Sequence, residues 1–345
     1  MAAHREEKPI APGQTFAVDR FRPDDAPGLV NLYTSVYGPH YTWECYYDPA
    51  WLVGANRNGD LYSVVARTPA GDIVAHGALF RSSPHHPNLY EGGQYVSHKA
   101  YRHTFAIHRI NRHVTGPLAR EVGVDGVFGE EVCHQLASQK AAALGGAKDC
   151  AIQIDLMPAA TYEREKSLTG RACCCTSYIS YRDRPQATFI PPVYREAVDG
   201  IAADLGLERE WRSADAGAPG EAASELTVRF FDDAAVGRFN VVAAGADFAA
   251  AVAGLEQEGA GRGTLVYQFF LNAGRPGIGP AVDILRARGY FVGGYVPRWF
   301  DSDGLLMQKV LSEPDFAAIQ LYTDKARRLL DFIRRDFDRA RREAG

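Results

Sequence analysis

The sequence predicts a mixed α/β protein built from two domains. Its 345 residues exceed the usual size of one compact domain. Short segments rich in β-branched and aromatic residues alternate with segments of helical spacing over residues 15–185, and again in a shorter series over 225–313. Residues 213–224, rich in Ser, Ala, Gly and Pro, are typical of a linker. We therefore expect one fuller and one shorter domain.

The first domain begins with a βα unit. Asp24 and Asp25 follow the expected strand 16–18 and suit the N-cap of a helix over 28–37. Two strands around the turn-forming pair Pro69 and Gly71 predict an antiparallel hairpin. The elements expected after the first helix are strands at 61–66, 73–80, 90–97, 126–134, 150–156 and 171–181, and helices at 107–118, with a kink at Pro117, and at 136–144.

Residues 186–224 are expected to form a connecting region, with a helix over 194–211 and then the linker. The elements expected after it are strands at 226–231, 238–242 and 265–271, helices at 247–257 and 278–288, and further strands through 290–311, of which 303–309 is the last. The last segment, 314–345, predicts an amphipathic helix with one apolar face, formed by Ile319, Tyr322, Ala326, Leu329, Leu330, Ile333 and Phe337. Acidic residues interrupt its basic face, which favours docking on the domain over binding to a membrane or nucleic acid.

Composition excludes several classes of protein. With 46% hydrophobic and 23% charged residues, the chain is an ordinary globular protein, and no apolar run approaches the roughly 20 residues that span a bilayer. Residues 1–14 lack the apolar stretch of a secretory signal and predict a disordered tail, so we expect a cytoplasmic protein. A net charge of −4 argues against general nucleic-acid binding.

Cysteine and histidine usage gives no metal site. The six cysteines include three consecutive ones, Cys173 to Cys175, and form no CxxC pair, so we expect free buried thiols and no zinc. A run of histidines also invites a metal interpretation, but it lacks ligand spacing on a straight helix with a carboxylate partner. Its members are His85, His86, His98, His103, His108 and His113.

The order of elements over 15–185, together with one motif, resembles the GNAT acyltransferase superfamily. Residues 96–102, Val-Ser-His-Lys-Ala-Tyr-Arg, are similar to the end of the family's fourth strand and the start of its acyl-CoA motif, Arg/Gln-x-x-Gly-x-Gly/Ala. Arg102 fits the first position, whereas Phe105 and Ile107 occupy the two glycine positions. This departure leaves open how the motif would hold CoA.

The resemblance implies an acyl-CoA donor, with acetyl-CoA foremost, and no metal. In the family, backbone N–H groups at a helix N-terminus bind the pyrophosphate, where the helix dipole also favours anions. The cofactor-binding residues implied here are Val96, His98, Arg102, His103, Thr104, Phe105, Ala106 and Ile107.

The resemblance also implies a base and an oxyanion donor on the fourth and fifth strands. Glu131 or Glu91 would be the base, and the Val96 N–H would stabilise the oxyanion. Because neighbouring strand residues point to opposite faces, only one of Glu130 and Glu131 can face a cleft; a carboxylate facing solvent is the plain alternative for each. His134 would orient the acceptor or move a proton, unless local backbone satisfies it.

Residues 265–272 and 287–291 resemble the closing half of a GNAT domain, so the second domain is interpreted as a truncated copy. Its Gly274-Arg275-Pro276-Gly277-Ile278-Gly279 segment leaves two alternatives open. One is a dinucleotide fingerprint with reversed spacing, and the other is a donor-phosphate site in this copy.

The sequence thus predicts an N-acyltransferase that acts on an amine of a small molecule or protein, with the first domain catalytic. Two alternatives stay open, because the glycines and the family's frequent tyrosine on the helix after the fifth strand are missing. One is an enzyme whose donor is an acyl carrier protein, and the other is a non-catalytic ligand-binding protein of GNAT-like fold. A homodimer is compatible with the sequence.

Overall fold

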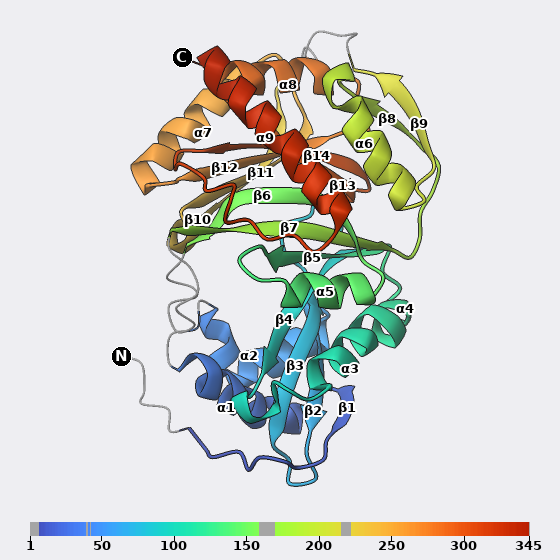
Figure 1. Ribbon diagram of the computed structural model, residues 1–345, viewed down its shortest axis with the longest axis vertical. Coiled ribbons are helices and arrows are strands. Elements are labelled where there is room, and N and C mark those ends of the chain that lie inside the picture. Colours follow the sequence, from blue (N-terminus) through green and yellow to red (C-terminus); the bar gives the residue numbers. More distant parts are fainter. Residues whose placement is uncertain (1–6, 39–40, 42, 159–169, 215–221, 345) are drawn as a thin grey trace. The chain divides into compact units, whose positions relative to one another are not determined.

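The computed structural model describes residues 7–38, 41, 43–158, 170–214 and 222–344 (Figure 1). The chain divides into two compact units, the first formed by Met1–Ser82 and Tyr90–Val127 and the second by Ser83–Leu89 and Phe128–Gly345. The boundary falls inside strand β5 (Gly126–Val132). None of the helices in the described part of the chain combines the length and apolar character needed to cross a bilayer.

The first unit is a sheet with helices on both faces. Its strands pair antiparallel in the order β1 (Ala17–Arg20), β2 (Leu61–Arg67), β3 (Ile73–Phe80) and β4 (Leu89–Ser97). Its helices are α1 (Ala26–Tyr37), α2 (Pro49–Asn58), α3 (Ala106–His113) and α4 (Ala119–Val122). Neighbouring residues of β3 point to opposite faces: His76 bonds Tyr33 of α1, and Gly77 lies against Ile110 of α3.

One helix of this unit escaped the sequence analysis, although its signals are present. Asp48 caps α2 by accepting a hydrogen bond from the Ala50 N–H at 2.8 Å, Pro49 occupies its first position, and Gly59 ends it in a left-handed conformation. The predicted kink at Pro117 is confirmed, because a π-helical turn (Val114–Leu118) separates α3 from α4.

The second unit holds one larger sheet. Its strands follow the order β5, β7, β6, β13, β14, β12, β11, β10. The bounds are β6 (Lys148–Pro158), β7 (Arg171–Ser180), β10 (Glu225–Phe231), β11 (Val236–Ala243), β12 (Val266–Asn272), β13 (Phe291–Phe300) and β14 (Ser302–Val310). The helices are α5 (Ala137–Leu144), α6 (Pro192–Asp204), α7 (Phe248–Arg262), α8 (Ile278–Ala287) and α9 (Asp324–Ala344).

Two series of strands share one order. Strands β5, β6 and β7 lie as 5-7-6, and strands β12, β13 and β14 lie as 12-14-13. The antiparallel pair β10–β11 precedes the second series as β3–β4 precedes the first. The two series join where β6 and β13 pair, with Gly294 opposite Ala151. This order confirms a fuller and a truncated copy of one α/β arrangement.

The connecting region differs from its prediction. The helix predicted at 194–211 ends at Asp204, and Gly206 turns the chain at φ 66° into strand β9 (Arg209–Ser213). Strand β9 pairs in parallel with β8 (Gln186–Ile190) as a separate two-stranded sheet, so neither strand joins the main sheet in the places of β1 and β2. Residues 215–221 of the predicted linker lie outside the described part of the chain.

The C-terminal helix docks as predicted but starts later, at Asp324 rather than near 314. Ile333 and Phe337 are among its buried residues. The buried Asp336 carboxylate accepts hydrogen bonds from the Tyr194 hydroxyl at 2.8 Å and the Val292 N–H at 2.9 Å. These bonds tie α9 to α6 and β13.

The thiols behave as predicted. All six cysteines are free, and five of them are buried.

Candidate functional site

Strand β4 carries a bulge just before residues 98–107, the predicted acyl-CoA-binding segment, which we call the donor loop. Gln94 has a left-handed backbone with φ 58°, and the β3–β4 register shifts between His76 and Ala78. The Tyr41 hydroxyl donates to the Gln94 side-chain oxygen. A left-handed non-glycine residue is strained and persists only where its surroundings hold it, and bulges of this kind redirect the strand. The bulge at Gln94 therefore sets the direction in which the end of β4 leaves the sheet.

The two predicted residues at the end of β4 are largely engaged in structure. Val96 is buried and lies opposite His76 in the sheet. The His98 Nδ1 accepts a hydrogen bond from the Ala100 N–H at 3.3 Å and thereby caps the turn Lys99–Tyr101. Burial lowers the pKa of His98, so its ring is neutral at pH 7.

The segment between this turn and α3 is open to solvent. Its exposed residues are Arg102, His103, Thr104 and Phe105. The Thr104 hydroxyl donates to the Tyr101 carbonyl at 2.7 Å and accepts from the Ala106 N–H at 3.2 Å, so it ties the first turn of α3. The Arg102 guanidinium has no side-chain partner among the described residues. This is the surface that the acyl-CoA motif was predicted to form.

The two residues in glycine positions lie differently. The Phe105 side chain is 75% exposed, and its ring lies edge-to-face with that of His108, with 6.5 Å between the ring centroids. Ile107 is only partly buried, whereas Ala106 between them is fully buried. Neither larger side chain is packed into the core of the unit, so both belong to the surface at the start of α3.

The charge of this region is strongly biased. Between Glu91 and Glu121 the chain has no acidic residue. The basic side chains in this interval are Lys99, Arg102, Arg109, Arg112 and Arg120, and four histidines accompany them. Because α3 lies inside this interval, the positive end of its dipole and these cations have the same sign. The region is suited to a ligand with several negative charges.

Glu91 belongs to the same unit as this loop. It lies on β4 opposite Phe80 and is partly buried. Burial, with a smaller contribution from Glu91, raises the pKa of Tyr46. Glu91 thus belongs to the same unit as the predicted cofactor-binding residues, while Glu131 and His134 belong to the second.

Glu131 is a perturbed carboxyl group. The Ser177 hydroxyl donates to it at 2.8 Å, and burial raises its pKa to about 8, assisted by the negative charge of Asp149. Glu130 points to the other face of β5, where it accepts from Arg238 at 3.1 Å and Gln153 at 2.9 Å. The alternation along the strand was predicted correctly, and Glu131 is the group whose protonation changes near neutral pH.

His134 follows the end of β5 and is partly buried. Its neighbour Cys133 is buried, and burial raises the pKa of that thiol strongly. A thiol in this state is not ionised at pH 7, so Cys133 is not poised as a nucleophile beside His134.

In the truncated copy, the position that corresponds to the donor loop is filled by the chain itself. The Ala246 N–H donates to the Ala222 carbonyl at 3.1 Å, and the Gly245 N–H donates to the Ser224 hydroxyl at 2.9 Å. Asp247 stands at the N-cap position of helix α7, and its side chain accepts hydrogen bonds from the Ser224 N–H and hydroxyl, both at 2.7 Å. These bonds lower the pKa of Asp247, so an anion lies where a phosphate would bind.

Close packing explains two of the glycines in the 274–279 motif of this copy. A Cβ on Gly279 would lie 1.9 Å from the Ala214 carbonyl oxygen, and one on Gly274 would lie 2.6 Å from Ser302. The two glycines therefore allow close contact with neighbouring chain, and they leave no bare surface for a pyrophosphate. This geometry argues against both the dinucleotide and the donor-phosphate interpretations of the motif.

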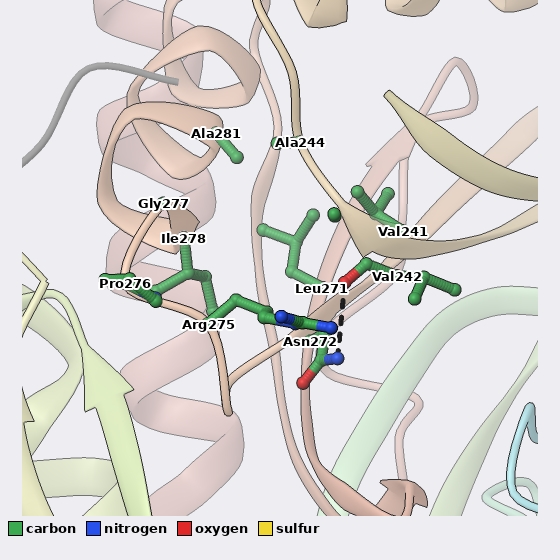
Figure 2. A pocket seen from close by; sticks show the side chains of 11 residues that line it. Val241, Val242, Ala244, Leu271, Asn272, Arg275, Pro276, Gly277, Ile278 and Ala281 are labelled. Atoms are coloured by element: carbon green, nitrogen blue, oxygen red, sulfur yellow. Dashed lines mark hydrogen bonds between the residues drawn. The ribbon is translucent and has the colours of Figure 1, made fainter. Parts of the chain in front are cut away.

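A separate cleft opens where the parallel strands β11 and β12 end, beside the first turn of α8 (Figure 2). Its volume is about 220 Å³. Most of its lining is apolar, and the lining residues are Val241, Val242, Ala243, Ala244, Leu271, Asn272, Arg275, Pro276, Gly277, Ile278 and Ala281. Figure 2 shows the Arg275 side chain reaching from the turn before α8 toward Asn272.

Three features escaped the sequence analysis. The acid-free interval between Glu91 and Glu121 was readable from the sequence by charge pattern alone. The bulge at Gln94 has no signal in residue type. The cleft at Arg275 depends on how two distant strands end, which a local pattern does not reveal.

Comparisons with known proteins give structural similarity alone. No protein-family model and no curated protein matches the sequence. Similar solved structures include the ribosomal-protein-S5-alanine acetyltransferase from Vibrio fischeri, at 10% identity and TM-score 0.39, covering 48% of this chain and 93% of that one. An N-acetyltransferase from Staphylococcus aureus Mu50 is 14% identical with TM-score 0.38, over 48% and 98%. The yncA protein of Salmonella typhimurium, solved with its cofactor acetyl-CoA, is 12% identical with TM-score 0.39, over 49% and 96%.

By the order of its own strands, the chain repeats one α/β arrangement in a fuller and a shorter copy, and the solved structures similar to about half of it include acetyltransferases, one of them a putative acetyltransferase of the GNAT family from Desulfovibrio desulfuricans.

Proposed function

We propose that the protein is an N-acyltransferase that takes its acyl group from acyl-CoA, with acetyl-CoA as the first donor to test. The observation that carries this proposal is the acid-free, basic interval that runs from β4 into α3 and exposes Arg102 and His103. A nucleotide thioester carries several phosphate charges, which cations and the N–H groups of a helix N-terminus bind together. The buried free cysteines suit a reducing compartment, and we propose the cytoplasm as the place of action.

The lost glycines are compatible with this donor. Phe105 is directed to solvent rather than packed over the chain, and the first N–H groups of a helix have no partner within it whatever the side chains are. Val96, His98, Thr104, Ala106 and Ile107 would then shape the loop, while Arg102 and His103 would contact phosphate.

Acyl transfer needs the amine to lose a proton before it attacks. The nitrogen forms a bond to the thioester carbon, the carbon–sulfur bond breaks, and the thiolate takes up a proton. We assign the role of base to Glu91, because it shares a unit with the donor loop, and the oxyanion role to the Val96 N–H. Glu131, with a pKa near 8, is the second candidate base, and His134 would orient the acceptor.

The acceptor is an amine of a small molecule or a protein. We further assign catalysis to the domain over residues 15–185, and to residues 225–313 the role of shaping the cleft that binds the acceptor. Residues 186–224 connect the two, and 314–345 form the C-terminal helical segment.

The donor is tested by calorimetric titration with acetyl-CoA and desulfo-CoA. Micromolar binding is expected to weaken at least about tenfold in Arg102→Ala, the loss of one charge-assisted contact. Arg57→Ala, an exposed arginine on α2 of the same unit, is the matched control and should bind as the wild type does. If neither ligand binds, or if both variants lose the same affinity, this donor site is wrong.

One observation favours a second candidate, an enzyme that takes its acyl group from an acyl carrier protein. Phe105, an exposed aromatic side chain beside the proposed donor loop, offers an apolar contact for such a carrier protein. In that case Phe105→Ser should reduce turnover with an acylated carrier protein and leave turnover with acyl-CoA unchanged. Equal effects on both donors would exclude it.

A further inference from the structure

The cleft between β11, β12 and α8 has the composition of a small-molecule site. It is lined mostly by aliphatic side chains from three elements, among them Val241, Leu271 and Ile278. An apolar cavity of about 150 Å³ is enough to bind benzene, and this cleft has about 220 Å³. Its size therefore suits a straight chain of roughly four to eight carbons.

One cationic group stands at the edge of this apolar space. The Arg275 guanidinium has no acidic partner among the described residues, and its side chain is exposed and directed toward Asn272. The Asn272 amide is already used, since it donates to the Val242 carbonyl at 3.2 Å and accepts from the Gly274 N–H at 2.9 Å. Arg275 is thus the charged group left to meet a ligand.

The same copy lacks a place for a nucleotide. The start of α7 is occupied by Ala222 and Ser224 and carries the ionised Asp247. A phosphate would have to displace these bonds and lie beside a carboxylate, so a CoA thioester is disfavoured here. What the cleft offers is an apolar space ending in a cation.

We propose that this cleft binds a short-chain aliphatic carboxylate, with the chain between the ends of β11 and β12 and the carboxylate on Arg275. Guanidinium and carboxylate match in charge and in planar geometry. The site is separate from the acyl-transfer chemistry of the first unit and makes the truncated copy a ligand-binding module.

The test is calorimetric titration of the full chain with propanoate, butanoate and hexanoate, compared with hexylammonium and 1-hexanol. Affinity is expected to rise about fourfold for each added methylene and to be at least tenfold lower for the cation and the alcohol of the same length. Equal binding of hexanoate and hexanol would overturn the role of Arg275, and no binding up to about 10 mM would overturn the site.

Three variants separate the site from other effects. Arg275→Gln removes the charge from an exposed side chain and should weaken hexanoate binding about tenfold. Gly277→Val should fill the cleft without a clash, because the nearest atom to its Cβ, the Ala244 carbonyl oxygen, is 3.9 Å away. Arg328→Gln, an exposed arginine on α9, is the charge control and should bind normally.

Acetyl-CoA titrations on the same variants keep this inference distinct from the proposed enzyme. Donor binding should be unchanged in Arg275→Gln and Gly277→Val, and hexanoate binding unchanged in Arg102→Ala. If Gly277→Val abolishes acetyl-CoA binding, the cleft is the donor site and the carboxylate proposal is wrong.

Discussion

Glu131 is expected to make the protein less stable as the pH rises from about 5 to 9. Its pKa is raised from 4.5 to about 8 in the folded state. Between these values the folded protein holds a proton that the unfolded chain has released, so the free energy of unfolding falls with increasing pH. The stability is fully present below the unfolded pKa and is lost as the pH passes through the folded pKa.

The magnitude follows from the size of the pKa change. Each pH unit of change corresponds to about 1.4 kcal/mol, which gives an upper limit of about 5 kcal/mol for the change from 4.5 to about 8. The residue as a whole is partly exposed, so solvent screens part of this cost. We therefore expect a loss of about 2–3 kcal/mol across the window.

The assay is denaturant unfolding of wild type and Glu131→Gln at pH 5, 6, 7, 8 and 9. The glutamine keeps the shape of the side chain but does not titrate, so the difference in stability between the two proteins should move by about 2–3 kcal/mol in favour of the variant. Ser177→Ala removes the hydrogen bond that lowers the folded-state pKa, so in this variant the loss of stability should begin at the same pH but continue to a higher pH. A constant difference, or the same change in the exposed Glu196→Gln, would refute a buried, protonated Glu131.

Three further predictions rest on packing and burial. Gly279→Ala should destabilise the protein by about 1–3 kcal/mol, because the new Cβ would lie 1.9 Å from a carbonyl oxygen. Gly200→Ala, at a helical position with open space around it, should stabilise the protein by about 0.5–1 kcal/mol. Thermal unfolding checks both variants, and equal effects would contradict the packing argument. Arg238→Met should lower the free energy of unfolding by about 3–5 kcal/mol, because it leaves the buried partners Glu130 and Gln153 unpaired. Adding Glu130→Gln should restore part of this stability in denaturant unfolding. If it restores none, the broken Arg238–Glu130 ion pair is not the cause of the loss. Iodoacetamide should modify the native protein slowly and only at Cys45, because burial keeps the other five cysteines as un-ionised thiols. After denaturation all six cysteines should react, and mass spectrometry reads both results.

The strands and most helices were predictable because their signals are local. Strand β3, for example, is an apolar run interrupted by His76 and Gly77, and its predicted bounds, 73–80, agree with the structure; α8 was placed within one residue. The errors arise where one residue outweighs the pattern. Gly206 ends α6 early, and the cap at Asp48 starts a helix in a segment without strong apolar periodicity.

The candidate site was predictable only as a position in the chain. Arg102 and its neighbours do form an exposed loop before a helix, as the motif indicated. The state of Glu131 depends on a distant part of the chain, because its raised pKa comes from burial beside Ser177. The capping role of His98 is local, since its partner is the Ala100 N–H in the turn that follows, but it shows only once that turn is known.

The two copies show how one arrangement of strands supports opposite electrostatics at the same position. After β4 the chain enters α3 through a basic, solvent-open loop that contains Arg102, whereas after β11 it enters α7 through a loop closed by Ser224 and Asp247. A carboxylate at the start of the helix opposes a pyrophosphate, so Asp247 disfavours the second loop, and we propose the first loop as the site of a nucleotide donor. The second copy retains a cleft at the ends of its parallel strands and a cation beside it, which restricts it to a smaller ligand that carries a single charge.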